Sequence, residues 1–211
     1  KIVSLPDGNY AIDSFFDVFT ELSVDGGMTW MPAYNGSTHM EVEPDPPPIT
    51  TSSDLLPPPD GHYVSPTEWH QAYANGIVIK DVSHEGFTGP HPPPPADSTE
   101  DHVFGSTVEC EVSTDGGMSF SPATFTGNVG ARVRGVYDDG PTRYFDTEML
   151  SLDLVGGPFM IRESPTLPSK GKTSMRTLPG GEWETSSFFD VFTEMSTDGG
   201  MTWSPADGPA Q

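Results

Sequence analysis

Three copies of one short pattern constrain this chain more than any other feature of its sequence. Residues 15–33 (the first copy) and 188–206 (the last copy) are the same 19-residue segment apart from three substitutions. Residues 106–123 (the middle copy) keep the second half of the pattern and lack its phenylalanines. Each copy alternates in polarity, continues into Asp-Gly-Gly and ends near an aromatic residue, which is typical of two strands joined by a tight turn. The copies therefore predict β-hairpins and an all-β fold.

The alternation also predicts which side of each strand is buried. In the middle copy Val108, Cys110 and Val112 share one face, and Glu109 and Glu111 lie on the opposite, solvated face. The outer copies carry aromatic side chains on that opposite face, at Phe15, Phe19, Phe188 and Phe192. Because large apolar side chains on a solvent face need cover, we expect these four residues to form assembly faces.

The composition favours short strands and stiff connections over long helices. Glycine and proline each occur 23 times in 211 residues, well above the usual combined share of about 12 %. Twelve Phe, six Tyr and four Trp are too many aromatic residues for a disordered acidic chain, so part of the chain must bury a core. We expect antiparallel, β-sandwich-like modules joined by proline-rich spacers.

Composition shifts predict four segments. They are an N-terminal hairpin segment (1–42), a proline-rich acidic spacer (43–62), a small connecting region with a proline-rich end (63–98), and a β module that holds the middle and last copies (99–211). The one short helical turn that we predict spans 66–74, with Ser65 as its N-cap and Pro66 at its first position.

The charge excludes two classes of partner. The formal net charge is −22 at pH 7, and such a surface repels nucleic acid phosphates and anionic lipid heads. No apolar stretch approaches the ~18 residues that a membrane span needs, so we expect no membrane insertion. The single cysteine, Cys110, allows no intrachain disulfide and is expected to be buried and inert.

The turn of each copy resembles the Asp-box, the Ser-x-Asp-x-Gly-x-Thr-Trp hairpin of bacterial sialidases and other secreted β proteins. The resemblance covers eight residues per copy, at 23–30, 113–120 and 196–203. It implies that the carboxylate caps backbone N–H groups of the turn and that the aromatic residue packs beneath it. The carboxylates are Asp25, Asp115 and Asp198, and the aromatic residues are Trp30, Phe120 and Trp203. We expect structural turns and no cofactor, with weak Ca²⁺ binding by these acidic turns as the alternative.

A catalytic sialidase would need an arginine triad, a tyrosine nucleophile and a propeller longer than this chain. Arginines occur at 132, 134, 143 and 162, with Tyr137 and Tyr144 nearby. At about 40–50 residues per blade the chain is too short for that propeller. We therefore expect no enzymatic activity.

A second resemblance covers the outer copies and residues 143–175. The segment Ser-Phe-Phe-Asp-Val-Phe-Thr-Glu, at 14–21 and 187–194, is similar to segments of secreted repeat proteins from planctomycete-like aquatic bacteria. Those proteins look like surface or extracellular structural components. The resemblance implies a secreted or cell-surface location.

The ends of the outer copies differ. The first copy continues into the strand-like residues 39–42, and the last copy reaches Gln211 near the corresponding point. If an unpaired sheet edge is completed by another molecule, the contact is head-to-tail, and a head-to-tail contact that does not close builds a filament. We expect a homopolymer of this kind. The alternative is that residues 1–42 pack on residues 61–90 as a small domain.

The sequence allows two other functions and one modification. An exposed platform among the four tryptophans would favour a carbohydrate-binding module, and a pair of carboxylates in a cleft would favour a glycoside hydrolase fragment. Glycans on the protein itself would suit an exposed fibre. The acceptors for them are the sequon residue Asn35 and the hydroxyls of Thr50, Thr51, Ser52 and Ser53.

Overall fold

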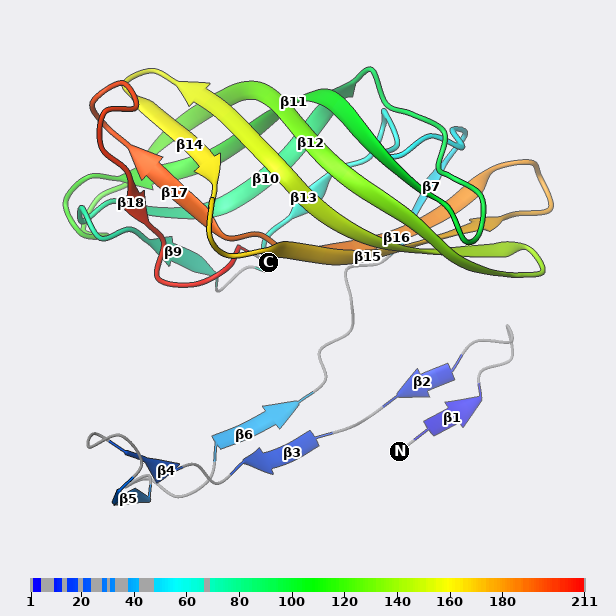
Figure 1. Ribbon diagram of the computed structural model, residues 1–211, viewed down its shortest axis with the longest axis horizontal. Helices are drawn as coiled ribbons and strands as arrows, with labels where there is room; N and C mark the ends of the chain where they lie inside the picture. The colour runs from blue at the N-terminus through cyan, green and yellow to red at the C-terminus, as the bar shows by residue number, and fades with distance from the viewer. Residues whose placement is uncertain are drawn as a thin grey trace. The chain divides into compact units, whose positions relative to one another are not determined.

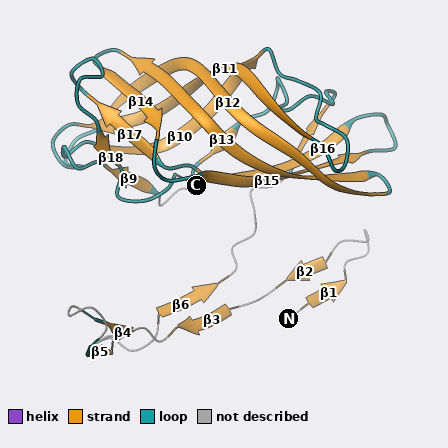
Figure 2. Cartoon of the chain, viewed as in Figure 1, coloured by secondary structure: helices purple, strands orange, loops and turns teal. Residues whose placement is uncertain are grey.

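The computed structural model describes residues 2–4, 10–12, 15–18, 21–23, 28–29, 31–32, 38–41, 48–66 and 69–210. The chain forms two compact units, Lys1–Pro46 and Pro47–Gln211. The described elements are all strands (Figure 2), so the predicted all-β fold is confirmed. Among these residues, no helix has the length and hydrophobicity to span a membrane.

The first unit contains three small antiparallel pairs. Strand β1 pairs with β2, β3 with β6, and β4 with β5. Their bounds are β1 (Ile2–Ser4), β2 (Tyr10–Ile12), β3 (Phe15–Val18), β4 (Glu21–Leu22), β5 (Met31–Pro32) and β6 (Thr38–Glu41). The first copy of the repeat pairs as the predicted hairpin requires, because β4 and β5, which lie before and after its Asp-Gly-Gly sequence, form an antiparallel pair.

The second unit is one curled antiparallel sheet of 12 strands (Figure 1). Its strands are β7 (Ile49–Thr51), β8 (Tyr63–Val64), β9 (His70–Ala72), β10 (Val78–Thr88), β11 (Thr99–Ser113), β12 (Ser121–Asp139), β13 (Thr142–Gly156), β14 (Phe159–Glu163), β15 (Ser169–Thr177), β16 (Trp183–Asp190), β17 (Thr193–Ser196) and β18 (Ser204–Pro205). The long central strands β10 to β13 pair in sequence order as a meander.

Strand β13 divides the sheet into two branches. Its first half pairs with β15, which leads on to β16 and β7. Its second half pairs with β14, which leads on to β17 and β18. On the other side of the sheet, β10 pairs with β9 along Val78–Lys80 and with β8 at Ser83 and His84.

The β18 branch closes onto β9. Tyr73 and Ala206 form an antiparallel bridge, and the Asp207 N–H donates to the carbonyl oxygen of Ala72 at 2.8 Å. Beneath this bridge the hydroxyls of Tyr73 and Thr193 lie 2.8 Å apart. The sheet therefore curls until two of its edges meet.

The inside of the curl is the hydrophobic core. Its main cluster includes Phe125 and Met195, both fully buried, together with the predicted core face of the middle copy. That face is confirmed, since Val108, Cys110 and Val112 are all buried. A second cluster comprises Leu56, Val133, Phe145 and Met175, against which Trp183 packs.

One predicted local assignment differs from the structure. The helical turn predicted for 66–74 is wrong, because His70–Ala72 forms β9 and pairs with β10. The range predicted as a spacer, 43–62, contains β7, which pairs with β16. Likewise β8, β9 and β10 lie in the range predicted as a connecting region and belong to the large sheet.

Candidate functional site

The turn of the middle copy is organised around Asp115. Its Oδ1 accepts hydrogen bonds from the Ser113 hydroxyl at 2.7 Å, the Met118 N–H at 3.0 Å and the Ser119 N–H at 2.9 Å. Its Oδ2 accepts one from the Ser119 hydroxyl at 2.6 Å. Gly117, at a φ of 90°, donates its N–H to the Ser113 oxygen at 2.8 Å. Positive φ favours glycine here, so the Asp-Gly-Gly sequence fits the turn that it forms.

The turn of the last copy repeats this network around Asp198. The Ser196 hydroxyl and the Thr202 N–H donate to Oδ1 at 2.8 and 2.9 Å, and the Thr202 hydroxyl donates to Oδ2 at 2.6 Å. The Gly200 N–H donates to the Ser196 oxygen at 2.9 Å. The third predicted carboxylate, Asp25, lies outside the described residues.

The aromatic residue of each described turn is half-buried beneath a cation. Trp203 donates its Nε1–H to the Gly200 carbonyl at 3.0 Å, and the Arg162 guanidinium lies 4.1 Å from its ring centroid. The Lys80 ammonium lies 4.6 Å from the ring centroid of Phe120. Both rings are thus covered on one face by a charged group. Trp30 lies outside the described residues.

The hydrogen bonds of these turns stabilise the ionised carboxylates. The Thr202 side chain and backbone, followed by the Ser196 hydroxyl, lower the pKa of Asp198 to about 2. The Ser119 and Ser113 hydroxyls hold the pKa of Asp115 well below its usual range. A carboxylate whose pKa is lowered by folding stabilises the fold above its ordinary pKa of about 3.9, and this stabilisation is lost as pH falls through the folded-state pKa.

We therefore expect Asp198→Ala to lower the Tm clearly at pH 7. The Ser196 hydroxyl and the Thr202 N–H and hydroxyl would all lose the carboxylate to which they donate. The difference from the unsubstituted protein should shrink as pH falls from about 4 to about 2. Thermal unfolding at pH 7, 4 and 2.5 measures this, with Glu109→Ala on the exposed face of β11 as the control. An Asp198→Ala penalty that stays constant over this pH range would contradict the assignment.

The turn carboxylates are engaged by donors of the chain itself. Asp115 and Asp198 each use both oxygens within their own turns. In the part of the chain that the structure describes, no group of three or more His, Cys, Asp or Glu residues is placed to hold a metal ion.

A second feature is an unpaired edge of β16. Strand β15 pairs with residues 183–190 on one side. On the other side β7 pairs with residues 183–185 and Ala210 pairs with Val191, and no described strand pairs with residues 186–190 between them. We call residues 186–190 on this side the open edge.

The backbone of the open edge is oriented for pairing. The Val191 N–H donates to the Ala210 carbonyl at 2.8 Å, and the Val191 carbonyl accepts from the Ala210 N–H at 2.7 Å. Alternate residues of a strand direct their N–H and C=O groups to the same side. Ser187 and Phe189 therefore turn these groups toward the open edge.

Side chains join the inner face of the open edge to β8. The Tyr63 hydroxyl donates to the Ser187 oxygen at 3.0 Å, and the Tyr63 and Phe189 rings meet edge to face with centroids 5.8 Å apart. The His84 ring lies 6.4 Å from that of Tyr63, and burial lowers the pKa of His84 to about 4, so this imidazole is neutral near pH 7. Tyr63 is a contact that the sequence did not single out.

The predicted assembly residues fall on this edge in part. Phe188 is 43 % exposed, and Phe192, two residues after the open edge, is half-buried. Phe15 lies in β3, and Phe19 lies outside the described residues.

Among the predicted sugar acceptors, Thr50 and Ser52 are exposed and Ser53 is half-buried. Thr51 is buried and donates its hydroxyl to Asp60 Oδ1 at 2.5 Å, and Asn35 lies outside the described residues.

The described tryptophans do not form an exposed platform. Trp69 packs against the main core cluster and Trp183 against the second one, while Trp203 lies beneath its turn. A stacked aromatic pair lies instead at Tyr137, which is exposed, and Tyr144, which is half-buried, across β12 and β13 with ring centroids 4.5 Å apart. Gly140 and Pro141 form the turn between these two strands, and the Asp139-Gly140 dipeptide is the sequence signal for that pairing.

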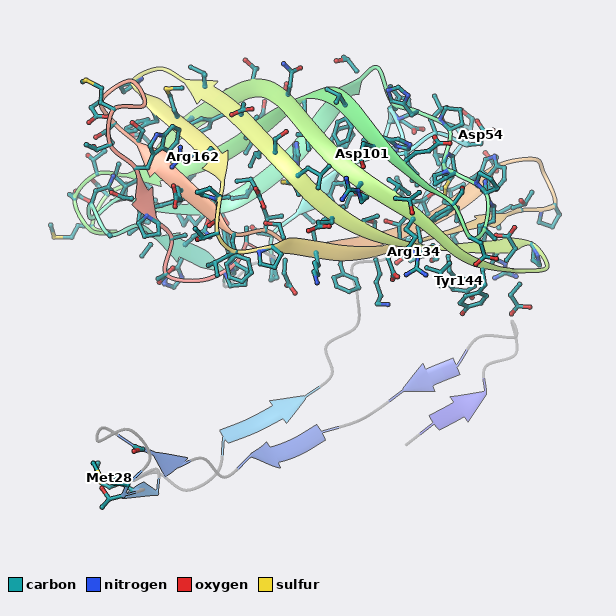
Figure 3. All side chains as sticks on the ribbon, viewed as in Figure 1. Met28, Asp54, Asp101, Arg134, Tyr144 and Arg162 are labelled. Atoms are coloured by element: carbon teal, nitrogen blue, oxygen red, sulfur yellow. The ribbon has the colours of Figure 1, made fainter. Side chains whose placement is uncertain are left out.

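The four arginines compared with a sialidase triad have separate carboxylate partners. Arg132 pairs with Asp101 at 2.8 Å, Arg134 with Asp146 at 3.7 Å, Arg143 with Asp138 at 3.7 Å and Arg162 with Glu194 at 2.6 Å. Figure 3 places Arg134 and Arg162 toward opposite ends of the curled sheet. These arginines therefore stabilise strand pairs individually.

Comparison with known proteins identifies one of the repeats. The family model described as BNR/Asp-box repeat matches residues 194–205, which hold most of β17, the Asp198 turn and β18. No curated protein and no solved structure matches the chain. BNR repeats are typical of extracellular proteins and also occur in glycosidases such as sialidases. The repeat and the all-β fold are compatible with an extracellular β module.

Proposed function

We propose that the protein is a structural subunit of an extracellular or cell-surface filament whose copies join head-to-tail by β-strand pairing. The open edge of β16 carries this proposal. It combines backbone groups at Ser187 and Phe189 with which no described strand pairs and an exposed phenylalanine at 188. Proteins normally cover, charge or twist such edges, because an edge of this kind recruits strands from other chains.

The other elements of the proposal agree with a structural role. The Asp115 and Asp198 carboxylates act within their turns, so the proposal includes no catalytic group and no cofactor. The extracellular location is supported by the Asp-box repeat and by the resemblance of the Ser-Phe-Phe-Asp-Val-Phe-Thr-Glu segments to those of secreted surface proteins. The exposed hydroxyls of Thr50 and Ser52 would carry any O-linked glycan.

Phe188→Glu tests the proposal. A glutamate on an edge strand opposes strand addition, because its charge must lose water when another strand covers it. We expect Phe188→Glu to shift the protein from polymer to monomer in sedimentation velocity. The measurement belongs at about 0.15 M ionic strength, where a Debye length of about 8 Å screens the repulsion between highly acidic subunits.

Val103→Glu is the matched control. Val103 is 62 % exposed on the central strand β11, so the same substitution adds the same charge away from the open edge. We expect Val103→Glu to assemble as the unsubstituted protein does. Equal assembly by both variants would contradict the role of the open edge.

A further inference from the structure

The open edge has the same sequence as a strand that is paired elsewhere in the chain. Phe-Phe-Asp-Val occurs at 15–18 as β3 and again at 188–191. In the first unit β3 pairs with β6, with Phe16 opposite Met40 and Asp17 opposite His39. One copy of this strand thus pairs with β6, whereas residues 188–190 of the other copy pair with β15 on one side and, among the described residues, with no strand on the other side.

The hairpins that follow the two strands pair in the same register. Glu21 lies opposite Pro32 in the first copy, and the corresponding residues of the last copy, Glu194 and Pro205, lie opposite each other. After each hairpin the chain returns to the same valine, through Thr38 opposite Val18 and through Ala210 opposite Val191. Strand β6 therefore occupies the edge of β3 that corresponds to the open edge of β16.

We propose that β6 of a second copy of this chain adds to the open edge through residues 39–41, with Met40 opposite Phe189, His39 opposite Asp190 and Glu41 opposite Phe188. This inference rests on the proposed function and names the segment that joins the subunits. The acceptor presents to the incoming strand the sequence with which β6 already pairs in its own unit. When β6 moves from β3 of its own chain to β16 of another copy, the backbone hydrogen bonds that it makes to β16 replace those that it made to β3.

A row of charges across the sheet favours this register. Asp101, Arg132, Glu148, Lys170 and Asp190 are successive cross-strand neighbours on β11, β12, β13, β15 and β16. Opposite charges on facing residues stabilise paired strands, and Arg132 contacts Asp101 through two hydrogen bonds of 2.8 and 2.9 Å. The row alternates in sign and ends on Asp190. The proposed register continues it with His39, a residue that can carry positive charge.

The backbone geometry gives the inference a direct test. If Phe189 and Met40 exchange hydrogen bonds, the neighbouring pair Asp190 and His39 is a non-hydrogen-bonded pair, whose Cα atoms lie about 4.5 Å apart. That separation suits a disulfide, which needs Cα atoms about 4.4–6.8 Å apart. Cys110 remains in both proteins, because it is buried and burial raises the pKa of its thiol to about 12.

The experiment mixes two full-length proteins, one with His39→Cys and one with Asp190→Cys, and oxidises the mixture mildly. We expect a covalent dimer on a non-reducing gel that neither protein forms alone. Ser186→Cys replaces Asp190→Cys as the register control, since it lies four residues away along the strand, roughly 13 Å. Val103→Cys is the control for an exposed thiol away from the edge. Neither control should cross-link to His39→Cys.

Sedimentation of the same mixtures distinguishes a failure of β6 as the donor strand from a failure of assembly itself. Assembly without the specific cross-link, or with equal cross-linking to Ser186→Cys, would overturn β6 as the donor and leave the proposed function standing. Monomers under all conditions would overturn both.

Discussion

Removing residues 1–46 is expected to leave a folded monomer that no longer assembles. The open edge of β16 remains in residues 47–211, but the strand proposed to fill it, β6, is removed with the first unit. Both core clusters lie within residues 47–211, so the large sheet keeps its buried side chains. Sedimentation velocity measures the loss of assembly, and thermal unfolding followed by circular dichroism measures retention of the fold.

The truncated protein also tests whether the open edge of β16 accepts a strand from another copy. Because it keeps the open edge, it should cap the ends of growing polymers when added to the full-length chain and shorten them. Long polymers formed by the truncated protein alone would show that the first unit is not needed, which contradicts strand donation.

Phe125→Ala is expected to destabilise the large sheet more than any surface substitution. Phe125 lies on β12, is fully buried, and belongs to the main core cluster. A Cβ on Gly156 would lie 2.7 Å from the Phe125 ring, so the ring packs directly against the backbone of β13. Removing such a side chain costs about 3–5 kcal/mol, because apolar contact is lost and a cavity remains.

That cost is a large part of the roughly 5–15 kcal/mol by which a domain is stable. At roughly 2–4 °C per kcal/mol for a chain of this size, the Tm should fall by roughly 6–20 °C. Val155→Ala on the adjacent strand is the control, since Val155 is 51 % exposed and its truncation should cost no more than about 0.5 kcal/mol. A Phe125→Ala protein with an unchanged Tm would mean that the core is packed differently.

Local features of the fold could be predicted from the sequence because hairpins depend on nearby residues. The alternation of the middle copy predicted the buried face of β11, and the Asp-Gly-Gly pattern predicted turns whose carboxylates accept hydrogen bonds from residues three and four positions later. These contacts involve short separations along the chain, so their signal lies within a few residues.

The curl and the open edge could not be predicted in this way. The bridge that closes the sheet joins residues 73 and 206, and no local pattern encodes a pairing at that separation. The capping residue Ser65 and Pro66 predicted a helical turn, but pairing with β10 made His70–Ala72 a strand, because tertiary context overrides local preference. Within the acidic proline-rich range, Ile49, Thr50 and Thr51 are β-branched and form β7.

The most direct test of the account is negative-stain electron microscopy of the purified full-length protein, with and without EDTA. The account predicts regular filaments in both conditions, because strand pairing builds them and the turn carboxylates are held by donors of the chain itself. Filaments lost in EDTA would make the acidic turns calcium sites. A monodisperse monomer of 22.7 kDa in both conditions would contradict the structural role.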